Sequence, residues 1–356
     1  MGLLYTKYKM FHYQSKLDSL PREVGKISPP IHIRIKPTNV CNHNCWYCAY
    51  RSDSLQLGQD MVERDYIPLE KMLEIIEDCA EMGVKAITFS GGGEPLVYRH
   101  LKEAIKSLVT HKINFASLSN GSRLTGEIAE LFAKHATWLR ISIDGWDDAS
   151  YARYRGVKEG EFSKVIRNLE NFKKLGGKCL LGISLILDKD NWIHVRDFTR
   201  LLKSIGVDTV KISPCIISND GYENDTYHAP FYEEAKELVT LAKHELEDSR
   251  FEINDSYHRA EIDFAKDYDW CPMLQMLPVI GADLNIYPCQ DKAYNLQDGL
   301  LGNIRNQRFK DWWFSDKNNF FKINPSKVCN HHCVANSKNK MILEYLDADK
   351  GHLGFV

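Results

Sequence analysis

Short runs of β-branched and aromatic residues alternate with amphipathic segments from about residue 31 to residue 215. Two neighbouring parallel strands need a crossover long enough for a helix, so this alternation is typical of βα units built around a parallel sheet. The pattern therefore predicts an α/β fold. The six predicted strands are Ile31–Lys36, Val84–Phe89, Asn114–Leu118, Trp138–Ile143, Cys179–Leu187 and Thr209–Ser213.

The segments between these strands have the periodicity of helices that pack on a sheet. In the run from Leu69 to Cys79, apolar side chains recur three and four residues apart and share one face. Cys79 lies on that face and is predicted to be a core residue, as is the isolated Cys179. A longer helix is predicted from about Pro230 to Asp248.

The composition changes near residues 267–270, where short pieces rich in Asn and Cys replace the helical runs. This change predicts three parts: an N-terminal extension over residues 1–30, the α/β unit over residues 31–266, and a small C-terminal region over residues 267–356. A region with that composition is expected to depend on a metal for part of its fold.

Polar and glycine-rich turns follow the predicted strands. Gly91-Gly-Gly-Glu94-Pro follows the second strand, Ser119-Asn-Gly121 follows the third, and Asp144-Gly145 follows the fourth. Because parallel sheets bind ligands at the C-terminal ends of their strands, we expect these turns to meet at one functional site.

Charge and hydropathy restrict the partners and the location. The net charge is -2 and the pI is about 6.7, so no basic surface for nucleic acid is expected. No segment approaches the roughly 20 apolar residues of a membrane span, and no signal peptide is evident. We expect a cytoplasmic protein, with no membrane or nucleic-acid partner, whose ten cysteines stay reduced and in part bind metal.

Cys41, Cys45 and Cys48 form a tight group directly after the first strand. Three thiolates with this spacing can hold an iron–sulfur cubane and leave its fourth iron without a protein ligand. The alternative is a structural zinc site, which requires a fourth ligand, and only His43 is near enough in the sequence.

The order of these motifs resembles the radical S-adenosylmethionine (SAM) superfamily, in which CxxxCxxC after the first strand is followed by GGGEP after the second. The resemblance implies a partial (β/α)6 TIM-like barrel, a [4Fe–4S] cluster on the three cysteines, and oxygen-sensitive, oxidoreductase-like chemistry begun by a 5′-deoxyadenosyl radical. It also implies an external electron donor such as flavodoxin or ferredoxin. The residues implied to bind the cofactor are Tyr47, Gly91, Gly92, Gly93, Glu94, Ser119, Asn120, Ser142, Asp144 and Arg155.

The C-terminal region resembles the SPASM and twitch extensions of that superfamily, which hold auxiliary clusters on a β-hairpin and a following helix. The resemblance implies one auxiliary [4Fe–4S] cluster on Cys271, Cys289, Cys329 and Cys333 and a role in electron transfer. Structural zinc on the same thiolates is the alternative, and His331 or His332 could replace a cysteine. Leu284 stands where the family usually has glycine, so a different hairpin turn is expected.

Cys215 follows the sixth strand with the same side-chain parity as Lys211 and Ser213. It could therefore face the substrate and donate a hydrogen atom to a radical. The alternative is an ordinary buried thiol.

The substrate stays open at this level. Only about 30 residues precede the first strand, whereas peptide-modifying relatives often begin with a leader-binding domain. This favours dehydrogenation, or another C–H transformation, of a small polar metabolite, with modification of a peptide by cross-linking, oxidation or epimerisation as the alternative. A zinc-binding regulatory protein and an electron carrier without SAM chemistry are the remaining alternatives.

Overall fold

The computed structural model describes residues 3–52, 55, 57–258 and 263–355 of the chain. Its strands are β1 (His32–Ile35), β2 (Ala86–Phe89), β3 (Asn114–Ser119), β4 (Trp138–Ser142), β5 (Leu180–Leu187), β6 (Thr209–Pro214), β7 (Glu252–Asp255), β8 (Val279–Ile280), β9 (Asn285–Tyr287) and β10 (Gly302–Asn303). Its α-helices are α1 (Gln14–Leu17), α2 (Leu69–Met82), α3 (Leu101–Thr110), α4 (Gly126–His135), α5 (Asp148–Arg155), α6 (Glu161–Lys174), α7 (Val195–Ile205), α8 (Gly221–His228), α9 (Tyr232–Leu246), α10 (Leu296–Gly299), α11 (Phe309–Ser315), α12 (Pro325–Val328) and α13 (Asn336–Asp347).

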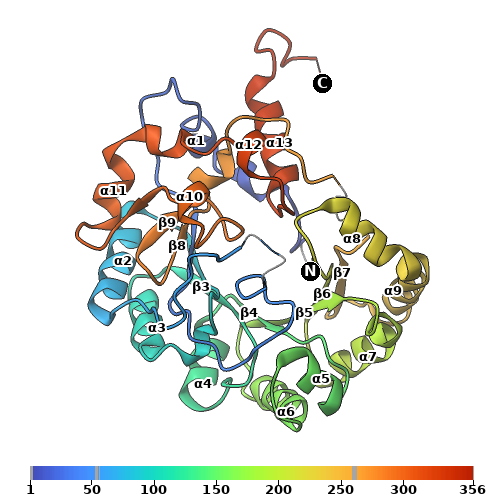
Figure 1. Ribbon diagram of the computed structural model, residues 1–356. Helices are drawn as coiled ribbons and strands as arrows, with labels where there is room; N and C mark the ends of the chain where they lie inside the picture. The colour runs from blue at the N-terminus through green and yellow to red at the C-terminus, as the bar shows by residue number, and fades with distance from the viewer. Residues whose placement is uncertain (1–2, 53–54, 56, 259–262, 356) are drawn as a thin grey trace.

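All ten strands belong to one sheet, with the order β10-β9-β8-β1-β2-β3-β4-β5-β6-β7. Strands β1 to β7 run parallel, and helices α2 to α9 surround them (Figure 1). The six predicted strands are confirmed as β1 to β6, with ends that differ by one or two residues. The seventh strand, β7, was missed because Ile253 is the single apolar residue among its four, so no alternation marks it as a strand.

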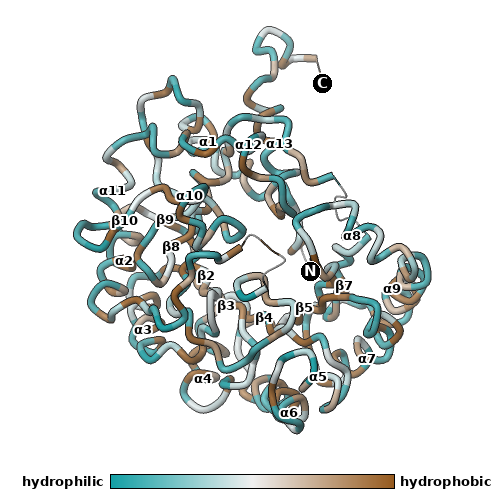
Figure 2. The backbone as a smooth tube through the Cα atoms, viewed as in Figure 1, coloured by the Kyte–Doolittle hydropathy of each residue, from teal (hydrophilic) through white to brown (hydrophobic). Residues whose placement is uncertain are grey.

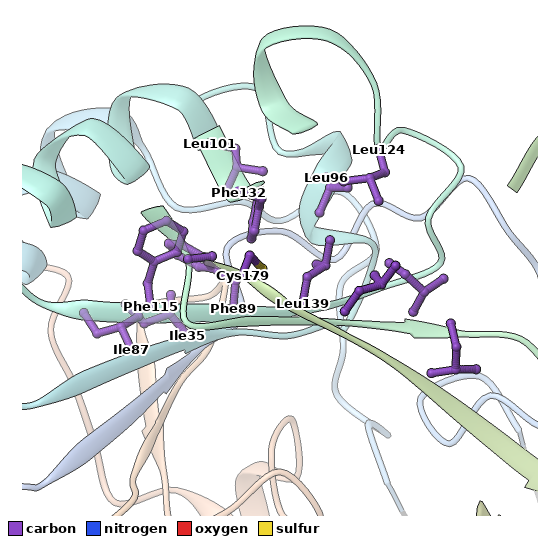
Figure 3. Close-up of a cluster of buried hydrophobic side chains, with 14 of the residues drawn as sticks. Ile35, Ile87, Phe89, Leu96, Leu101, Phe115, Leu124, Phe132, Leu139 and Cys179 are labelled. Carbon is purple, nitrogen blue, oxygen red and sulfur yellow. The ribbon is translucent and has the colours of Figure 1, made fainter. Parts of the chain in front are cut away.

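The main core lies between this sheet and the helices around it. Alternate residues of each strand point outward into that layer, which is why Ile33 and Ile35 of β1 are fully buried there. Figure 3 shows the layer closely packed, with Phe89, Phe115 and Cys179 among its members. Cys79 also lies in this core, so both isolated cysteines are buried as predicted.

The helices bury one face each, as their sequence periodicity predicts. Helix α2 ends at Gly83, which adopts a left-handed conformation (φ 79°) that glycine tolerates without strain. The hydrophobic colour in Figure 2 gathers on the strands and the hydrophilic colour on the outer turns. None of the helices in the described part of the chain combines the length and the apolar character that crossing a bilayer requires.

The C-terminal region continues the sheet of the barrel. Strand β8 pairs in parallel with β1, and β9 and β10 follow it in antiparallel pairing. Leu284, in the turn between β8 and β9, has a φ of 65°, which is the left-handed region that glycine usually occupies. The turn therefore keeps the backbone conformation of a glycine turn, although leucine stands at this position.

Residues near the N-terminus fasten this C-terminal region to the barrel. Lys317 donates to the carbonyl oxygens of Ser19 and Pro21 at 2.7 and 2.5 Å. Lys16 and Trp313 both donate to the carbonyl oxygen of Ser28, at 2.9 and 3.0 Å. Residues 16–28 thus form a clamp: they bind the C-terminal region through the side chains of Trp313 and Lys317.

Candidate active site

The loop that carries Cys41, Cys45 and Cys48 leaves the C-terminal end of β1 and is fixed by the end of α5. The backbone N–H of Asn44 donates to the carbonyl oxygen of Arg155 at 2.8 Å. The next residue, Gly156, ends α5 in a left-handed conformation, and a Cβ there would collide with the carbonyl oxygen of Asn44. Glycine is therefore required for α5 to approach the cysteine loop this closely.

The three thiols of the loop are the predicted ligands of an iron–sulfur cubane. All three are partly buried, and burial raises the pKa of Cys41 to about 11. His43 is also buried, and its ring packs edge-on against Tyr151 with centroids 6.0 Å apart. Among the described residues, the structure shows no group of three His, Cys, Asp or Glu side chains gathered around a single metal ion.

The glycine turn after β2 lies directly against the residues that lead into the cysteine loop. Gly93 donates its N–H to Thr38 at 3.1 Å, and Glu94 donates its N–H to Val40 at 2.9 Å. A Cβ on Gly93 would collide with the carbonyl oxygen of Val40, and one on Gly92 with Asn39. The turn from Gly91 to Glu94 thus has the close backbone approach that only glycine permits.

The side chain of Glu94 connects this turn to the end of β3. Its carboxylate accepts hydrogen bonds from the Ser119 hydroxyl at 2.8 Å, the Asn120 N–H at 2.7 Å and the Leu96 N–H at 2.9 Å. Burial raises the pKa of Glu94, while these donors lower it. Asn120 in turn donates to Asn42 of the cysteine loop at 2.9 Å. The predicted residues Glu94, Ser119 and Asn120 are therefore in one hydrogen-bonded group beside the loop.

Asp144, at the end of β4, holds two other predicted residues. One carboxylate oxygen accepts hydrogen bonds from the Tyr47 hydroxyl and from the Arg155 guanidinium, and the other accepts from the Ile186 N–H at 2.7 Å. Arg155 also donates to the Cys45 sulfur at 3.6 Å. The family resemblance implies that Arg155 binds SAM. In the structure its charge is already paired with Asp144, so direct contact with SAM stays a prediction.

Ser142 belongs to a polar row on the inner face of the barrel. It ends β4 and pairs in register with Ser184 of β5, which pairs with Lys211 of β6, which pairs with Asn254 of β7. The residues before and after Ser142, Ser184 and Lys211, and Ile253 before Asn254, belong to the outer core, so this row faces inward. Only Ser142 was predicted. The other three carry no local signal, because the register of distant strands brings them together.

Cys215 is almost completely buried, at 1% exposure. Its N–H donates to the carbonyl oxygen of Leu187 at 2.9 Å, and its carbonyl oxygen lies 2.8 Å from a ring nitrogen of His228. Burial raises the pKa of the thiol well above its usual range. This agrees with the alternative of an ordinary buried thiol, and the role of hydrogen donor stays a prediction.

The four C-terminal cysteines line one small cavity of about 70 Å³. The thiol of Cys271 accepts a hydrogen bond from the Asn339 amide at 3.2 Å, and His331 lies in the same wall. Three cationic side chains, Arg34, Lys266 and Lys292, also line the cavity and would offset the negative charge of a thiolate cluster. The four thiolate residues come from three separate segments, at Cys271, Cys289, Cys329 and Cys333. The fold therefore brings the four cysteines to one cavity, and whether they hold an auxiliary cluster stays a prediction.

A buried lysine joins the two cysteine sites. Lys36, directly after β1, donates to the Tyr50 hydroxyl at 2.6 Å and to the carbonyl oxygen of Gly91. Tyr50 donates its own hydroxyl to the carbonyl oxygen of Gln290 at 2.9 Å. Tyr50 stands two residues after Cys48, and Gln290 directly follows Cys289 in the sequence. Lys36 thus contacts the glycine turn directly and both cysteine-bearing segments through Tyr50. No local signal in the sequence predicted this arrangement.

Comparison with known proteins agrees with this geometry. Residues 35–202 match the pattern of the Radical SAM superfamily, and they include the three-cysteine loop and the glycine turn. The match spans a little under half of the chain and supports a radical SAM enzyme, since the members of this superfamily are enzymes.

Individual relatives are more distant. The chain is 31% identical over 108 residues to a SAM-dependent nucleotide dehydratase of Lacinutrix mariniflava, covering 30% of this chain and 22% of the relative. It is 26% identical over 190 residues to a GTP 3′,8-cyclase of Clostridium botulinum, covering 51% of this chain and 56% of the relative. The chain therefore spans less than two thirds of either curated relative.

Among solved structures, Streptococcus suis SuiB bound to its precursor peptide SuiA is similar, with a TM-score of 0.64 and 17% identity. The alignment covers 88% of this chain and 71% of SuiB. At this level of identity the likeness shows a shared fold.

Proposed function

We propose that this chain binds a [4Fe–4S] cluster through Cys41, Cys45 and Cys48 and uses SAM to begin radical chemistry on a small polar metabolite, with dehydrogenation as the reaction. The observation that carries the proposal is the three-cysteine loop packed against a glycine turn at the C-terminal end of the barrel. Three thiols at this loop would hold three of the four irons of a cubane and leave one corner open to SAM.

A second cluster, on Cys271, Cys289, Cys329 and Cys333, completes the proposal. When bound, the two groups would supply one-electron chemistry: reductive cleavage of SAM to a 5′-deoxyadenosyl radical at the loop, and acceptance at the four-cysteine cavity of the electron that dehydrogenation releases. The contact through Lys36 and Tyr50 supports this division of work, because it couples the two cysteine-bearing segments through buried polar atoms.

The residues of the chain have separate tasks in this proposal. The glycine turn lets SAM approach the backbone, while Glu94 keeps that turn and Asn120 in a fixed arrangement. Asp144 and Arg155 hold Tyr47 beside Cys45 and limit the access of water to the cluster. Ser142 and Ser184, on the inner face of the barrel, supply hydroxyl groups for a polar substrate.

Two substrate classes compete. The two curated relatives are named as a nucleotide dehydratase and a GTP cyclase, which supports a small polar substrate. The structural relative SuiB binds a precursor peptide, which is the reason to keep peptide modification as the alternative.

The decisive test begins with anaerobic reconstitution of the protein. We expect about eight iron atoms per chain, since each cubane holds four, and formation of 5′-deoxyadenosine after reduction with SAM present. Incubation with deuterium-labelled metabolite and peptide fractions of the host cell should then transfer deuterium into 5′-deoxyadenosine with the metabolite fraction. A product that is two mass units lighter in unlabelled form would identify dehydrogenation. Transfer from the peptide fraction alone would select the alternative, and zinc without iron would overturn the whole proposal.

A further inference from the structure

A second cavity, of about 450 Å³, lies at the N-terminal end of the barrel. Its wall includes the first residues of four adjacent strands: His32 of β1, Ala86 of β2, Asn114 of β3 and Trp138 of β4. The proposed active site lies beyond the C-terminal ends of the same strands (Figure 1). The two sites are therefore separated by the length of the strands, which is roughly 15 Å.

The charged side chains that line this cavity are all basic. Four lysines line it, Lys7, Lys9, Lys85 and Lys338, and neither Asp nor Glu does. Within the described part of the chain, none of these four lysines forms an ion pair with a carboxylate; Lys9 donates instead to the carbonyl oxygen of Leu4 at 2.6 Å. The whole chain has 46 basic and 48 acidic side chains, so a wall with four lysines and no acid is a local feature.

These positive groups are close enough to affect one another. Burial lowers the pKa of Lys338, on α13, and the nearby charges of Lys9 and Arg34 lower it further. Burial, followed by the charges of Arg34 and Lys338, also lowers the pKa of His32 to about 3. Like charges that face each other in a partly enclosed space are unfavourable, and a bound anion would relieve that repulsion.

The rest of the wall combines uncharged polar side chains with apolar and aromatic ones. Tyr13, Phe115 and Trp138 line the cavity together with Met273 and Met276. A volume of 450 Å³ falls within the range of small-molecule sites, roughly 300–1,000 Å³. The cavity can therefore hold a small molecule that has both an anionic group and an apolar or ring-shaped part.

The segment that closes one side of the cavity is fixed to the barrel. The Tyr5 hydroxyl lies 3.1 Å from the Thr209 hydroxyl and accepts a hydrogen bond from Arg140 at 3.1 Å. Further along the segment, the Met10 side chain is buried in a small cluster that includes Met276. These anchors on both sides of Lys7 and Lys9 hold the two lysines at the cavity, so the cationic wall is a built feature.

We propose that this cavity is a binding site for a small phosphorylated molecule, with the phosphate among the four lysines and the remaining skeleton against Trp138 and its apolar neighbours. Phosphate esters carry up to two negative charges and accept several hydrogen bonds, which matches a cluster of lysine ammonium groups. The site is separate from the proposed active site, so the proposal does not depend on radical chemistry.

Isothermal titration of the purified full chain with ADP, pyrophosphate and adenosine tests this proposal. S-Adenosylhomocysteine is kept at saturation, to occupy the place of SAM. We expect ADP and pyrophosphate to bind and adenosine to bind at least about tenfold more weakly, since a hydrogen bond to a charged group contributes about 1.5–3 kcal/mol. Lys85→Gln and Lys338→Gln should each weaken ADP binding about tenfold by the same reasoning. An increase of salt from 0.05 to 0.5 M should weaken it further.

Lys174→Gln is the matched control, because Lys174 is an exposed lysine at the end of α6 that does not line the cavity. Its ADP affinity should equal that of the unchanged protein. Thermal melts check that the variants remain folded, and Lys7→Gln, at the exposed rim, is a further variant that should also weaken binding. Equal ADP affinity in the cavity variants and the control would overturn the proposal, as would adenosine binding as tightly as ADP or no binding of either phosphate at millimolar concentration.

Discussion

The two cysteine sites of this protein are built in different ways. The loop with Cys41, Cys45 and Cys48 lies in one short segment, held by backbone hydrogen bonds to α5 and to the glycine turn. The cavity with the four C-terminal cysteines draws its thiols from three segments between Cys271 and Cys333, where regular structure is sparse. We therefore expect the fold alone to prepare the first site, whereas the proposed second site should need its ligand to keep the separate segments together.

The largest expected effect comes from a matched pair of substitutions. Cys45→Ser should reduce 5′-deoxyadenosine formation to the background rate, because a cluster with two protein thiolates is not retained at the loop. Cys329→Ser should preserve most of that reaction while lowering the iron content from about eight atoms to about four. Chromatography of 5′-deoxyadenosine and iron analysis measure both. Equal loss of SAM cleavage in the two variants would show that the sites are not separable.

Removal of the metal should loosen the C-terminal region more than the strands of the barrel. In chelated protein, backbone amides of residues 267–335 should exchange with deuterium faster by at least about a hundredfold, because the ligand that holds the segments is gone. Amides of β2 to β5 should keep their protection, since their strands are packed in the main core. Hydrogen-exchange mass spectrometry of the loaded and chelated chain gives both values. Uniform exchange across the chain would contradict the comparison.

Lys36 tests whether the two sites influence each other. A cation near a cluster stabilises the reduced form, so Lys36→Met should make both reduction potentials more negative, by on the order of 50 mV. Lys266 lines only the four-cysteine cavity, and Lys266→Met should lower one potential alone. Reductive titration followed by electron paramagnetic resonance separates the two clusters. If Lys36→Met leaves the reduction potential of either cluster unchanged, the charge of Lys36 does not influence that cluster.

The smallest effect concerns the clamp that supports the C-terminal region. Burial lowers the pKa of Lys16 to about 7, with a further contribution from the charge of Lys317. Between pH 7 and 10.5 the unfolded chain therefore binds the extra proton, so stability should rise with pH across this window. From pH 7 to pH 9 the contribution of Lys16 is roughly 2 kcal/mol. Urea melts at several pH values measure the free energy of unfolding. In Lys16→Met this free energy should rise less between pH 7 and pH 9 than in the unchanged protein. An equal rise in both proteins would contradict the prediction.

The sequence predicted the parts of the fold that depend on local patterns. Strands β1 to β6 and helices α2 and α9 were found because each leaves a periodic signal in its own residues. Strand β8 and the continuation of the sheet into the C-terminal region were not found, because Val279–Ile280 is too short to show a period. The turn at Leu284 was expected to differ from a glycine turn, yet its backbone adopts the same left-handed conformation.

The predicted site shows the same division. Cys41, Cys45, Cys48 and the glycine turn could be found from the sequence because their spacing is itself the signal. The task of Glu94 within the protein, the pairing of Arg155 with Asp144 and the contact between Lys36 and Tyr50 could not be found there. Each of these joins residues from different strand ends, and only the packed barrel brings those ends together.

The sequence by itself predicted the class of this protein. Three cysteines in one loop, followed by three glycines in one turn, are recognisable from their spacing and order alone. Only the tertiary structure decided how that site relates to the rest of the molecule. It joined the second set of cysteines to the first through a buried lysine, and it gathered four lysines at the opposite end of the barrel. The physical reason is the distance along the sequence over which each effect acts. Residue spacing determines which side chains are neighbours within one turn, whereas burial and charge act between residues that only folding brings into contact.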